Sequence, residues 1–381
     1  MNVEREFSSP DGSDLLALVR TLCEQELIPR ANAAEERAEF PRSLLRTLGA
    51  AGLLALPYPK QFGGGGLPYH DYLQVVEELS SAWATVGLSV SVHSLSCFPL
   101  AAFGTTDQQE RLLPGLLNGD LLGAYCLSET QAGSDAAALT TRAVADGDSY
   151  AVNGTKAWIS HAGIADFYST MVRTADTGTK GITCLLVPAD SEGLSFATPE
   201  RKLGFSASPT AQVRFDDVRV PNSRRIGEEG QGFAIAMAAL EAGRLGIAAC
   251  AVGIAQAALQ LAVSYARERQ QFGKPIAEFQ GLSFLLADMA TAVAAARALY
   301  LAAAKRKDAG KDFAVQASMA KLFATDAAMQ VTTDAVQVLG GAGYVKDFPA
   351  ERYFREAKAL QIVEGTNQIQ RMVIGRALTR S

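Results

Sequence analysis

The chain has 381 residues, of which 48% are hydrophobic and 20% charged, so it is a globular protein long enough for two or three domains. Its net charge of −5 and the lack of a basic run argue against nucleic acid or an anionic membrane surface as the main partner. Five scattered cysteines without a Cys-x-x-Cys pair, and three histidines outside metal-ligand spacing, argue against a disulfide framework and a metal site.

The N-terminal segment has Glu4 and Glu6 where a signal peptide would have a basic and then an apolar region. We therefore expect a cytosolic protein, or one of the mitochondrial matrix whose transit peptide has been removed. The most apolar window, residues 245–265, contains Gln256 and Gln260 among many small residues. That composition predicts a packed core helix and not a membrane span.

Residues 1–120 are predicted to form an N-terminal helical domain. Helices are expected over 14–30, from Pro41 or Ser43 to Gly52, and over 70–82, 86–103 and 107–117. The Gly63 to Gly66 run lacks the Gly-Lys-Ser/Thr of a phosphate-binding P-loop, so it is expected to be a flexible loop.

Residues 121–228 are predicted to form a central antiparallel β-barrel or sandwich. The segments 124–128, 140–145, 149–153, 157–160, 166–173, 182–188 and 212–220 are short, rich in β-branched or aromatic residues, and separated by turn residues. The Asn153-Gly154 pair predicts a hairpin turn between two of them.

Residues 229–381 are predicted to form a C-terminal four-helix bundle, with helices over 233–268, 280–307, 312–339 and after Thr366. In the first of these, apolar residues recur at seven-residue steps from Leu240 to Leu261. The fold class is therefore α+β, with the β segment between two helical domains.

Glu364 is the candidate general base. It follows an apolar, strand-like approach and precedes Gly365 and Thr366, a predicted N-cap of the last helix, whose inward stripe would be Ile369, Met372 and Val373. A carboxylate among apolar side chains, near free helix N–H groups, is expected to have a raised pKa, which suits a base. The alternative is an ordinary solvated turn residue.

A second candidate is the stretch from Tyr125 to Asp135, which reads as a strand end opening into a loop rich in hydroxyl and N–H groups. Such a loop could hold a polar ring edge or a phosphate. The same residue types are also the commonest in ordinary turns, so that reading stays open.

This stretch resembles the flavin loop of the acyl-CoA dehydrogenases, and further motifs similar to that family follow it in order. They are Ala157-Trp158-Ile159-Ser160, Lys202-Leu203-Gly204, Phe215 to Pro221, Gly232-Phe233 with Gly243-Arg244, Arg269 to Gly273, Gln337 to Gly341, and Glu364-Gly365-Thr366. Each motif alone is a weak signal, but together they cover essentially the whole chain.

The resemblance implies an FAD enzyme that removes the α and β hydrogens of a short- to medium-chain acyl-CoA thioester and leaves a trans-2-enoyl-CoA. Glu364 matches the base that takes the α proton, and flavin N5 takes the β hydride. The N–H of Glu364 and a flavin ribityl hydroxyl would bond the thioester carbonyl. An electron-transfer flavoprotein is the implied acceptor, and a homotetramer (a dimer of dimers) the implied assembly.

The resemblance also assigns binding residues. Flavin contacts are implied for Leu127, Ser128, Gly133, Ser134, Trp158, Ile159, Ser160, Thr366 and Gln368. Contacts with the FAD diphosphate and adenosine across a subunit boundary are implied for Arg269, Phe272, Gln280, Gln337, Gly340 and Gly341. Substrate contacts are implied for Ser134, Glu241, Arg244 and Gly365, although Glu241 and Arg244, at i and i+3 of a helix, could instead form a simple ion pair.

Some branches of the family place the base directly before the arginine of the long helix, but here that residue is Gly243. A glycine cannot act as a base, so Glu364 and the short- and medium-chain branches are favoured. The run from Gly243 to Ala249 and Ser128 in the flavin loop are most similar to the short-chain branch. Two other functions stay open: an oxygen-using flavin oxidase or monooxygenase on the same scaffold, and a non-catalytic helical binding module.

Overall fold

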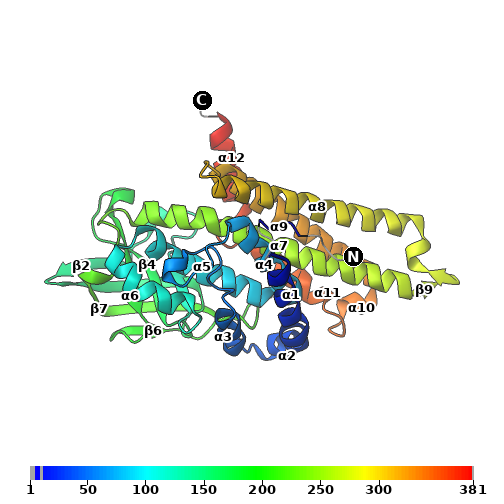
Figure 1. Ribbon diagram of the computed structural model, residues 1–381, viewed down its shortest axis with the longest axis horizontal. Coiled ribbons are helices and arrows are strands. Elements are labelled where there is room, and N and C mark those ends of the chain that lie inside the picture. Colours follow the sequence, from blue (N-terminus) through cyan, green and yellow to red (C-terminus); the bar gives the residue numbers. More distant parts are fainter. Residues whose placement is uncertain (1–4, 9–11, 380–381) are drawn as a thin grey trace.

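The computed structural model describes residues 5–8 and 12–379. Helices come first, a sheet follows, and long helices end the chain (Figure 1). The sheet lies at one end of the molecule, and the long C-terminal helices extend from it to the other end. This confirms the predicted α+β order of helical, β and helical regions.

The N-terminal helices are close to those predicted. They are α1 (Gly12–Leu22), α2 (Ile28–Arg37), α3 (Arg42–Ala50), α4 (Tyr69–Ala82), α5 (Ala84–Phe103) and α6 (Thr106–Leu117). The first predicted helix was expected to stop at Arg30, but a π-helical turn, Cys23–Leu27, joins α1 to α2 and the helix continues to Arg37. Pro29 directly follows this π-helical turn, where the regular i→i−4 hydrogen-bond ladder that a proline cannot join is already interrupted.

The sheet has eight strands: β1 (Gly123–Cys126), β2 (Arg142–Asp146), β3 (Ser149–Ser160), β4 (Phe167–Arg173), β5 (Ile182–Pro188), β6 (Leu194–Phe196), β7 (Thr210–Pro221) and β8 (Arg225–Ile226). Their order is β6-β7-β3-β2-β4-β5-β8, and β1 pairs with β4. The pairings are antiparallel except β1 with β4 and β2 with β4, which are parallel.

The predicted hairpin at Asn153-Gly154 is wrong. These residues lie inside β3 at a shift of register with β7, so the two predicted strands 149–153 and 157–160 are one. Gly154 is needed there because a Cβ atom would lie 2.7 Å from the Cα of Thr141. The actual turn is at Gly147, between β2 and β3, where the backbone has a φ of +63°.

The C-terminal region contains α7 (Gly232–Glu268), α8 (Gln280–Asp308), α9 (Ala314–Leu339), α10 (Gly341–Tyr344), α11 (Ala350–Leu360), α12 (Asn367–Thr379), and the small hairpin β9 (Gln270–Gln271) and β10 (Lys274–Pro275). Helix α7 is central, since it packs on α4, α5, α8, α9, α11 and strands of the sheet. Helix α11, which the sequence did not predict, packs against both α7 and α9.

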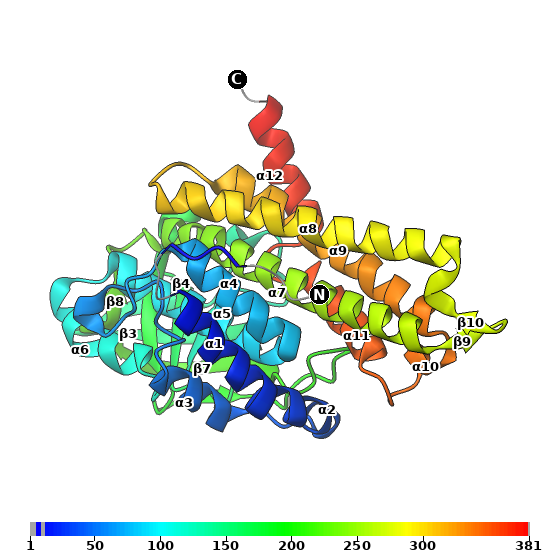
Figure 2. The ribbon, with the colours of Figure 1, turned by 45° about the vertical axis from the view of Figure 1, so that its right-hand side comes forward.

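Helix α12 packs on α9 and then projects away from the body of the molecule (Figures 1 and 2). Its predicted inward stripe is therefore wrong for this chain: Ile369 and Val373 are only half-buried, and Met372 is 39% exposed. The residues of this helix that are buried are polar, Asn367 and Gln370.

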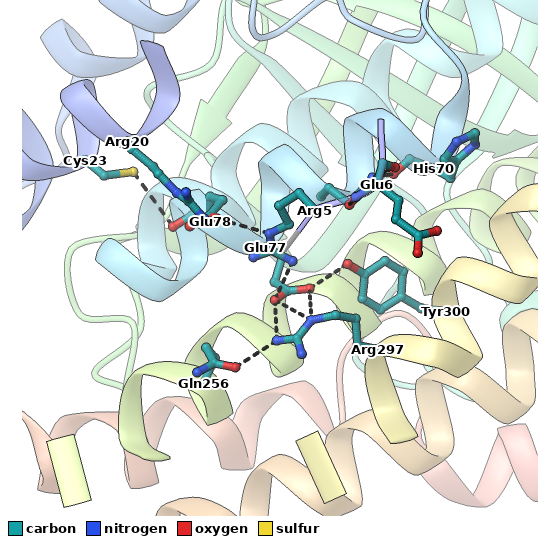
Figure 3. Close-up of polar contacts among 11 residues, drawn as sticks. Arg5, Glu6, Arg20, Cys23, His70, Glu77, Glu78, Gln256, Arg297 and Tyr300 are labelled. Atoms are coloured by element: carbon teal, nitrogen blue, oxygen red, sulfur yellow. Dashed lines mark hydrogen bonds and ion pairs between the residues drawn. The ribbon is translucent and has the colours of Figure 1, made fainter. Parts of the chain in front are cut away.

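A buried cluster of charges ties distant parts of the chain together (Figure 3). The carboxylate of Glu77, on α4, accepts hydrogen bonds from Arg297 and Tyr300 of α8 and pairs with Arg5 at 2.8 Å. Burial alone would raise the pKa of Glu77, but the two arginines outweigh it and lower that pKa below its usual value. The cluster therefore joins the N-terminal segment to the C-terminal helices.

By length and composition, α5, α7 and α8 could each cross a membrane. In the folded chain, 78% of the apolar window of α5 and 83% of that of α7 is buried, as expected for core helices. Only 17% of the window of α8 is buried, so this helix presents apolar surface that the described part of the chain does not cover.

Candidate active site

Glu364 lies in the turn between α11 and α12. The expected strand-like approach is wrong, because Ile362 and Val363 continue from α11 and donate their N–H groups to the carbonyl of Ala359. Glu364 has a φ of +51° and Gly365 one of +92°, so the turn reverses through two left-handed residues. For a non-glycine residue this costs roughly 1 kcal/mol, which the surrounding contacts must offset.

The turn is fastened to the helices on both sides. Thr366 Oγ1 accepts a hydrogen bond from the N–H of Ile369, so the predicted N-cap is confirmed. The ammonium of Lys321, on α9, donates to the carbonyl of Gly365 at 2.9 Å and to Oδ1 of Asn367 at 2.8 Å. The position of Glu364 is therefore set jointly by α9 and α12.

Lys321 was not predicted as a functional residue. It is wholly buried in α9, on the same face as the buried alanines Ala317, Ala324 and Ala328. The sequence does contain a signal for this residue, because Lys321 falls in a stripe of alanines at helical spacing that predicts a buried face. An ammonium is rarely buried without specific partners, so a lysine at such a position indicates a specific role.

The Glu364 carboxylate is shielded from solvent. Both oxygens are buried and, among the described residues, neither accepts a hydrogen bond. Burial raises the pKa of Glu364 to about 7, although Lys321 and Arg244 oppose this increase. The raised pKa expected of a base is thus confirmed.

Gly243, on α7, is directly beside this carboxylate. A Cβ atom built on Gly243 would overlap Oε2 of Glu364 and lie 3.2 Å from Leu95 Cδ1. A cavity of about 180 Å³ begins at Gly243 and runs between α5 and α7. Its lining is largely apolar and includes Tyr58, Tyr69, Leu95, Phe98, Ala239 and Ala242.

Glu241 and Arg244 form no ion pair with each other within the described part of the chain. The alternative prediction, a simple ion pair between these two residues of one helix, is therefore wrong. Arg244 is buried, and its Nε atom has no hydrogen-bond partner among the described residues. Burial lowers the pKa of Arg244, against the opposing effect of Glu241 and Glu364. An unpartnered buried guanidinium beside the carboxylate suits a polar or anionic ligand.

The predicted flavin loop is braced by a buried ion pair. Lys156 Nζ donates to Oε1 of Glu129 at 2.9 Å and to the carbonyl of Leu127 at 3.1 Å. The N–H of Ala157 donates to the carbonyl of Ser128. These bonds bring the two predicted flavin segments, 127–134 and 157–160, side by side.

The two segments present a surface that fits a flavin. Trp158 has a φ of +62° and its side chain is 60% exposed, while Gly133 and Ser134 are exposed on the adjacent loop. A Cβ atom on Gly133 would meet nothing within 4 Å, so its backbone is open to a ligand. An open aromatic face beside hydroxyl and N–H groups suits a planar polar ring.

Two predicted flavin residues have buried side chains. Leu127 and Ile159 belong to separate apolar cores on either side of the sheet strands. Only their backbones can reach a cofactor. Ser128 and Ser160 are half-buried, as is Thr366, whereas Gln368 is exposed on α12.

The residues predicted to hold the diphosphate and adenosine lie elsewhere. Arg269, Phe272 and Gln280 surround the β9–β10 hairpin, and Gln337, Gly340 and Gly341 end α9. All six are exposed, and Phe272 is 93% exposed. The hairpin and α10 lie at the end of the molecule away from the sheet (Figures 1 and 2), so one chain does not bring this group to Trp158.

The sequence matches all three domain models of one family. They are the acyl-CoA dehydrogenase N-terminal domain over residues 9–120, the middle domain over 124–218 and the C-terminal domain over 230–379. The chain belongs to the acyl-CoA dehydrogenase family. Members of that family are FAD-dependent oxidoreductases, and so is this protein.

Similar acyl-CoA dehydrogenases include the mitochondrial short-chain specific enzyme of Bos taurus, 44% identical over 95% of this chain and 88% of its own. The solved butyryl-CoA dehydrogenase of Megasphaera elsdenii is 40% identical, with a TM-score of 0.96 over 100% of both chains. A chain from work on the electron transferring flavoprotein of Acidaminococcus fermentans and flavin-based electron bifurcation is 41% identical, with a TM-score of 0.97 over 100% of both chains.

Proposed function

We propose that this acyl-CoA dehydrogenase converts a short- to medium-chain acyl-CoA thioester to the trans-2-enoyl-CoA. The observation that carries the proposal is the buried, unpartnered carboxylate of Glu364 against Gly243, a residue that lines a largely apolar cavity. The short-chain and butyryl-CoA specificities named for two similar proteins support it, as does the small volume of the cavity, about 180 Å³.

Glu364 is proposed to take the α proton of the thioester on its carboxylate. Its environment suits this role, because a desolvated carboxylate with a pKa of about 7 is a stronger base than a solvated one. Bound FAD supplies the acceptor for the β hydride.

The backbone N–H of Glu364 is proposed to polarise the thioester carbonyl. Among the described residues this N–H donates to no acceptor, so it is available to a ligand. A donor aimed at the carbonyl stabilises the negative charge that develops on its oxygen as the α proton leaves. Gly365 continues the same turn and would also border the substrate.

Arg244, with its unpartnered Nε, is proposed to contact the polar part of the substrate together with Glu241. Ser134 would lie where flavin and thioester meet. The flavin would be held by the loop from Leu127 to Ser134, by Trp158 to Ser160, and by Thr366 and Gln368.

The six exposed residues near the β9–β10 hairpin and the end of α9 are proposed to hold the diphosphate and adenosine of the FAD that is bound to a neighbouring copy of the chain. They are Arg269, Phe272, Gln280, Gln337, Gly340 and Gly341. Their distance from the flavin segments within one chain supports this arrangement. The uncovered apolar surface of α8 and the projecting α12 support a homotetramer, whose mass light scattering would measure. An electron-transfer flavoprotein is the proposed acceptor and the cytosol the proposed location.

Anaerobic mixing with saturated acyl-CoAs of different length, branching and terminal charge tests the function. We expect loss of flavin absorbance with short, unbranched acyl groups. No loss with any of them, in protein that holds FAD, would contradict the proposal. Faster turnover with oxygen than with an artificial acceptor would favour the oxidase alternative.

Glu364→Gln is expected to retain FAD but to lose roughly 10³-fold or more in activity, because the base is gone. In the unsubstituted enzyme, kcat/KM should rise with pH through about 7, since only the ionised carboxylate accepts the proton. Glu241→Gln is the matched control and should retain this pH profile. Near-normal rates in Glu364→Gln would place the base elsewhere, with Glu241 the first residue to test.

A further inference from the structure

We propose that Lys321 is a positioning residue for Glu364, holding the Glu364–Gly365 turn against α9 and keeping a positive charge beside the carboxylate. This inference rests on the proposed role of Glu364 as the base. It concerns how the base is held, and no part of the function proposed above requires it.

The burial of Lys321 is costly and therefore needs specific partners. Its side chain is completely buried, and it forms no ion pair with a carboxylate in the described part of the chain. Its hydrogen bonds go to the Gly365 carbonyl and the Asn367 side chain, both in or next to the turn that carries Glu364. A buried ammonium is tolerated only when such bonds replace its hydration.

These bonds reach the peptide group that defines the turn. The Gly365 carbonyl accepts from Lys321 Nζ at 2.9 Å and from Gln370 Nε2 at 2.9 Å, so two donors hold it. The Gly365 carbonyl belongs to the peptide directly after the two residues with positive φ, Glu364 and Gly365, so these bonds hold the end of the turn that leads into α12. Lys321 thus restrains the turn that carries the carboxylate beside Gly243.

Neighbouring side chains of α9 hold the two ends of the same turn. Asp326 Oδ1 accepts from Gln361 and from Asn367, each at 2.7 Å. The Asn367 amide also bonds Thr325 Oγ1 at 2.9 Å. Lys321 differs from these groups because it brings a positive charge close to Glu364, whereas Asp326 is a carboxylate and Thr325 and Asn367 are neutral.

The two groups affect each other's ionisation. Burial raises the pKa of Glu364, and Lys321 is the larger of the two opposing influences, the other being Arg244. Burial lowers the pKa of Lys321 to about 8, against the opposing effect of Glu364. The other titratable groups that interact with Glu364 are Tyr69 and Tyr72 of α4, Tyr125 of β1, and Cys250 and Arg244 of α7.

Each tyrosine and the cysteine has a pKa raised by burial, so these groups are neutral where the enzyme works. Lys321 and Arg244 are therefore the cations that favour the ionised base. Removing one of them should reduce the fraction of ionised Glu364 at neutral pH.

The experiment compares Lys321→Met, Lys321→Arg and Gln370→Met in the FAD-loaded enzyme. Lys321→Met removes the charge and one donor to Gly365, Lys321→Arg keeps a cation, and Gln370→Met removes the other donor without a change of charge. The readouts are flavin content, kcat and KM separately, and the pH at which kcat/KM reaches half its maximum.

For Lys321→Met we expect the half-maximum to move up by about one pH unit or more, and kcat at pH 7 to fall about 10-fold or more, with FAD retained. Lys321→Arg should restore the wild-type half-maximum. Gln370→Met should lower kcat without moving the half-maximum. A purely structural lysine would not move the pH profile.

Folded Lys321→Met with a wild-type rate and profile would overturn the inference. If Lys321→Met does not fold, Lys321→Gln is measured in the same way, and an unshifted profile there overturns it as well. Glu364→Gln, measured in parallel, separates the two proposals: activity retained in that variant refutes the base assignment, whereas its loss beside an unshifted Lys321 variant refutes only the role of Lys321.

Discussion

Gly243 and Glu364 constrain each other at the scale of single residues. Gly243 is buried inside α7, where glycine costs about 1 kcal/mol relative to alanine. The cost has a reason, because any Cβ atom here would overlap Oε2 of Glu364. From the sequence, Gly243 shows only that the base is not at position 243. In the structure, the missing side chain of Gly243 leaves the space that the Glu364 carboxylate occupies.

Gly243→Ala is expected to improve the helix and damage the enzyme. The methyl group should push the carboxylate aside and lower kcat/KM by about 10²-fold, with the flavin content unchanged. Steady-state kinetics and the flavin spectrum measure both effects.

The control is the same substitution in a Glu364→Asp background. The shorter side chain withdraws the carboxylate, so Gly243→Ala should cost much less there. Equal costs in the two backgrounds would mean that the methyl group acts on something other than Glu364.

At the scale of elements, the loop between β1 and β2 depends on a buried ion pair. Burial alone would raise the pKa of Glu129, but Lys156 and hydrogen bonds from Thr140 and Thr141 outweigh it and lower that pKa to about 2. This carboxylate therefore stabilises the fold above its unfolded pKa of about 4, and the contribution is lost as the pH falls through about 2.

Lys156→Met should loosen this loop. It leaves Glu129 charged, buried and unpaired, which costs about 3–5 kcal/mol, and it frees the Leu127 carbonyl at the predicted flavin site. We expect a lower melting temperature and less FAD retained after gel filtration.

The double variant Lys156→Met with Glu129→Gln is the control for this effect, because it removes both charges. It should recover part of the lost stability. A single variant with wild-type melting temperature and flavin content would show that the pair does not brace the loop.

Two elements show where sequence patterns were insufficient. Helix α11 was missed because its buried face mixes Ala357 and Leu360 with the buried charged residues Arg352 and Glu356, which interrupts the apolar stripe. The Asn153-Gly154 pair predicts a turn because its residue types favour one. In the structure that glycine instead allows β3 to pass close to Thr141.

At the scale of the whole molecule, the Glu77 cluster joins segments that are far apart in sequence (Figure 3). Arg5 precedes the first helix, Glu77 lies on α4, and Arg297 and Tyr300 lie on α8. The cluster therefore couples the N-terminal helices to the C-terminal region that carries the candidate site.

Glu77→Gln should weaken that coupling. It leaves buried arginines without their carboxylate, so unfolding free energy should fall by about 3–5 kcal/mol in denaturant titrations. The loss should appear at neutral pH and shrink in acid. Because the folded-state pKa of Glu77 is lowered, its ionic contribution is present above the unfolded pKa and disappears as pH falls through the folded one.

The control is Arg37→Met, which breaks the pair with Glu39. Both of those side chains are largely exposed, so the change should stay within about 0.5 kcal/mol. A Glu77→Gln variant as stable as Arg37→Met would show that the cluster adds no net stability.

The sequence by itself determined the order of domains, most helix positions and the candidate base, because these depend on local periodicity, caps and motifs of neighbouring residues. Only the tertiary structure decided that Lys321 holds the Gly365 carbonyl, that Gly243 borders the Glu364 carboxylate, and that Glu241 and Arg244 are not paired. Those facts depend on how distant helices are packed against each other. Helical periodicity gives the buried face of each helix but not the rotation and offset that choose its partners.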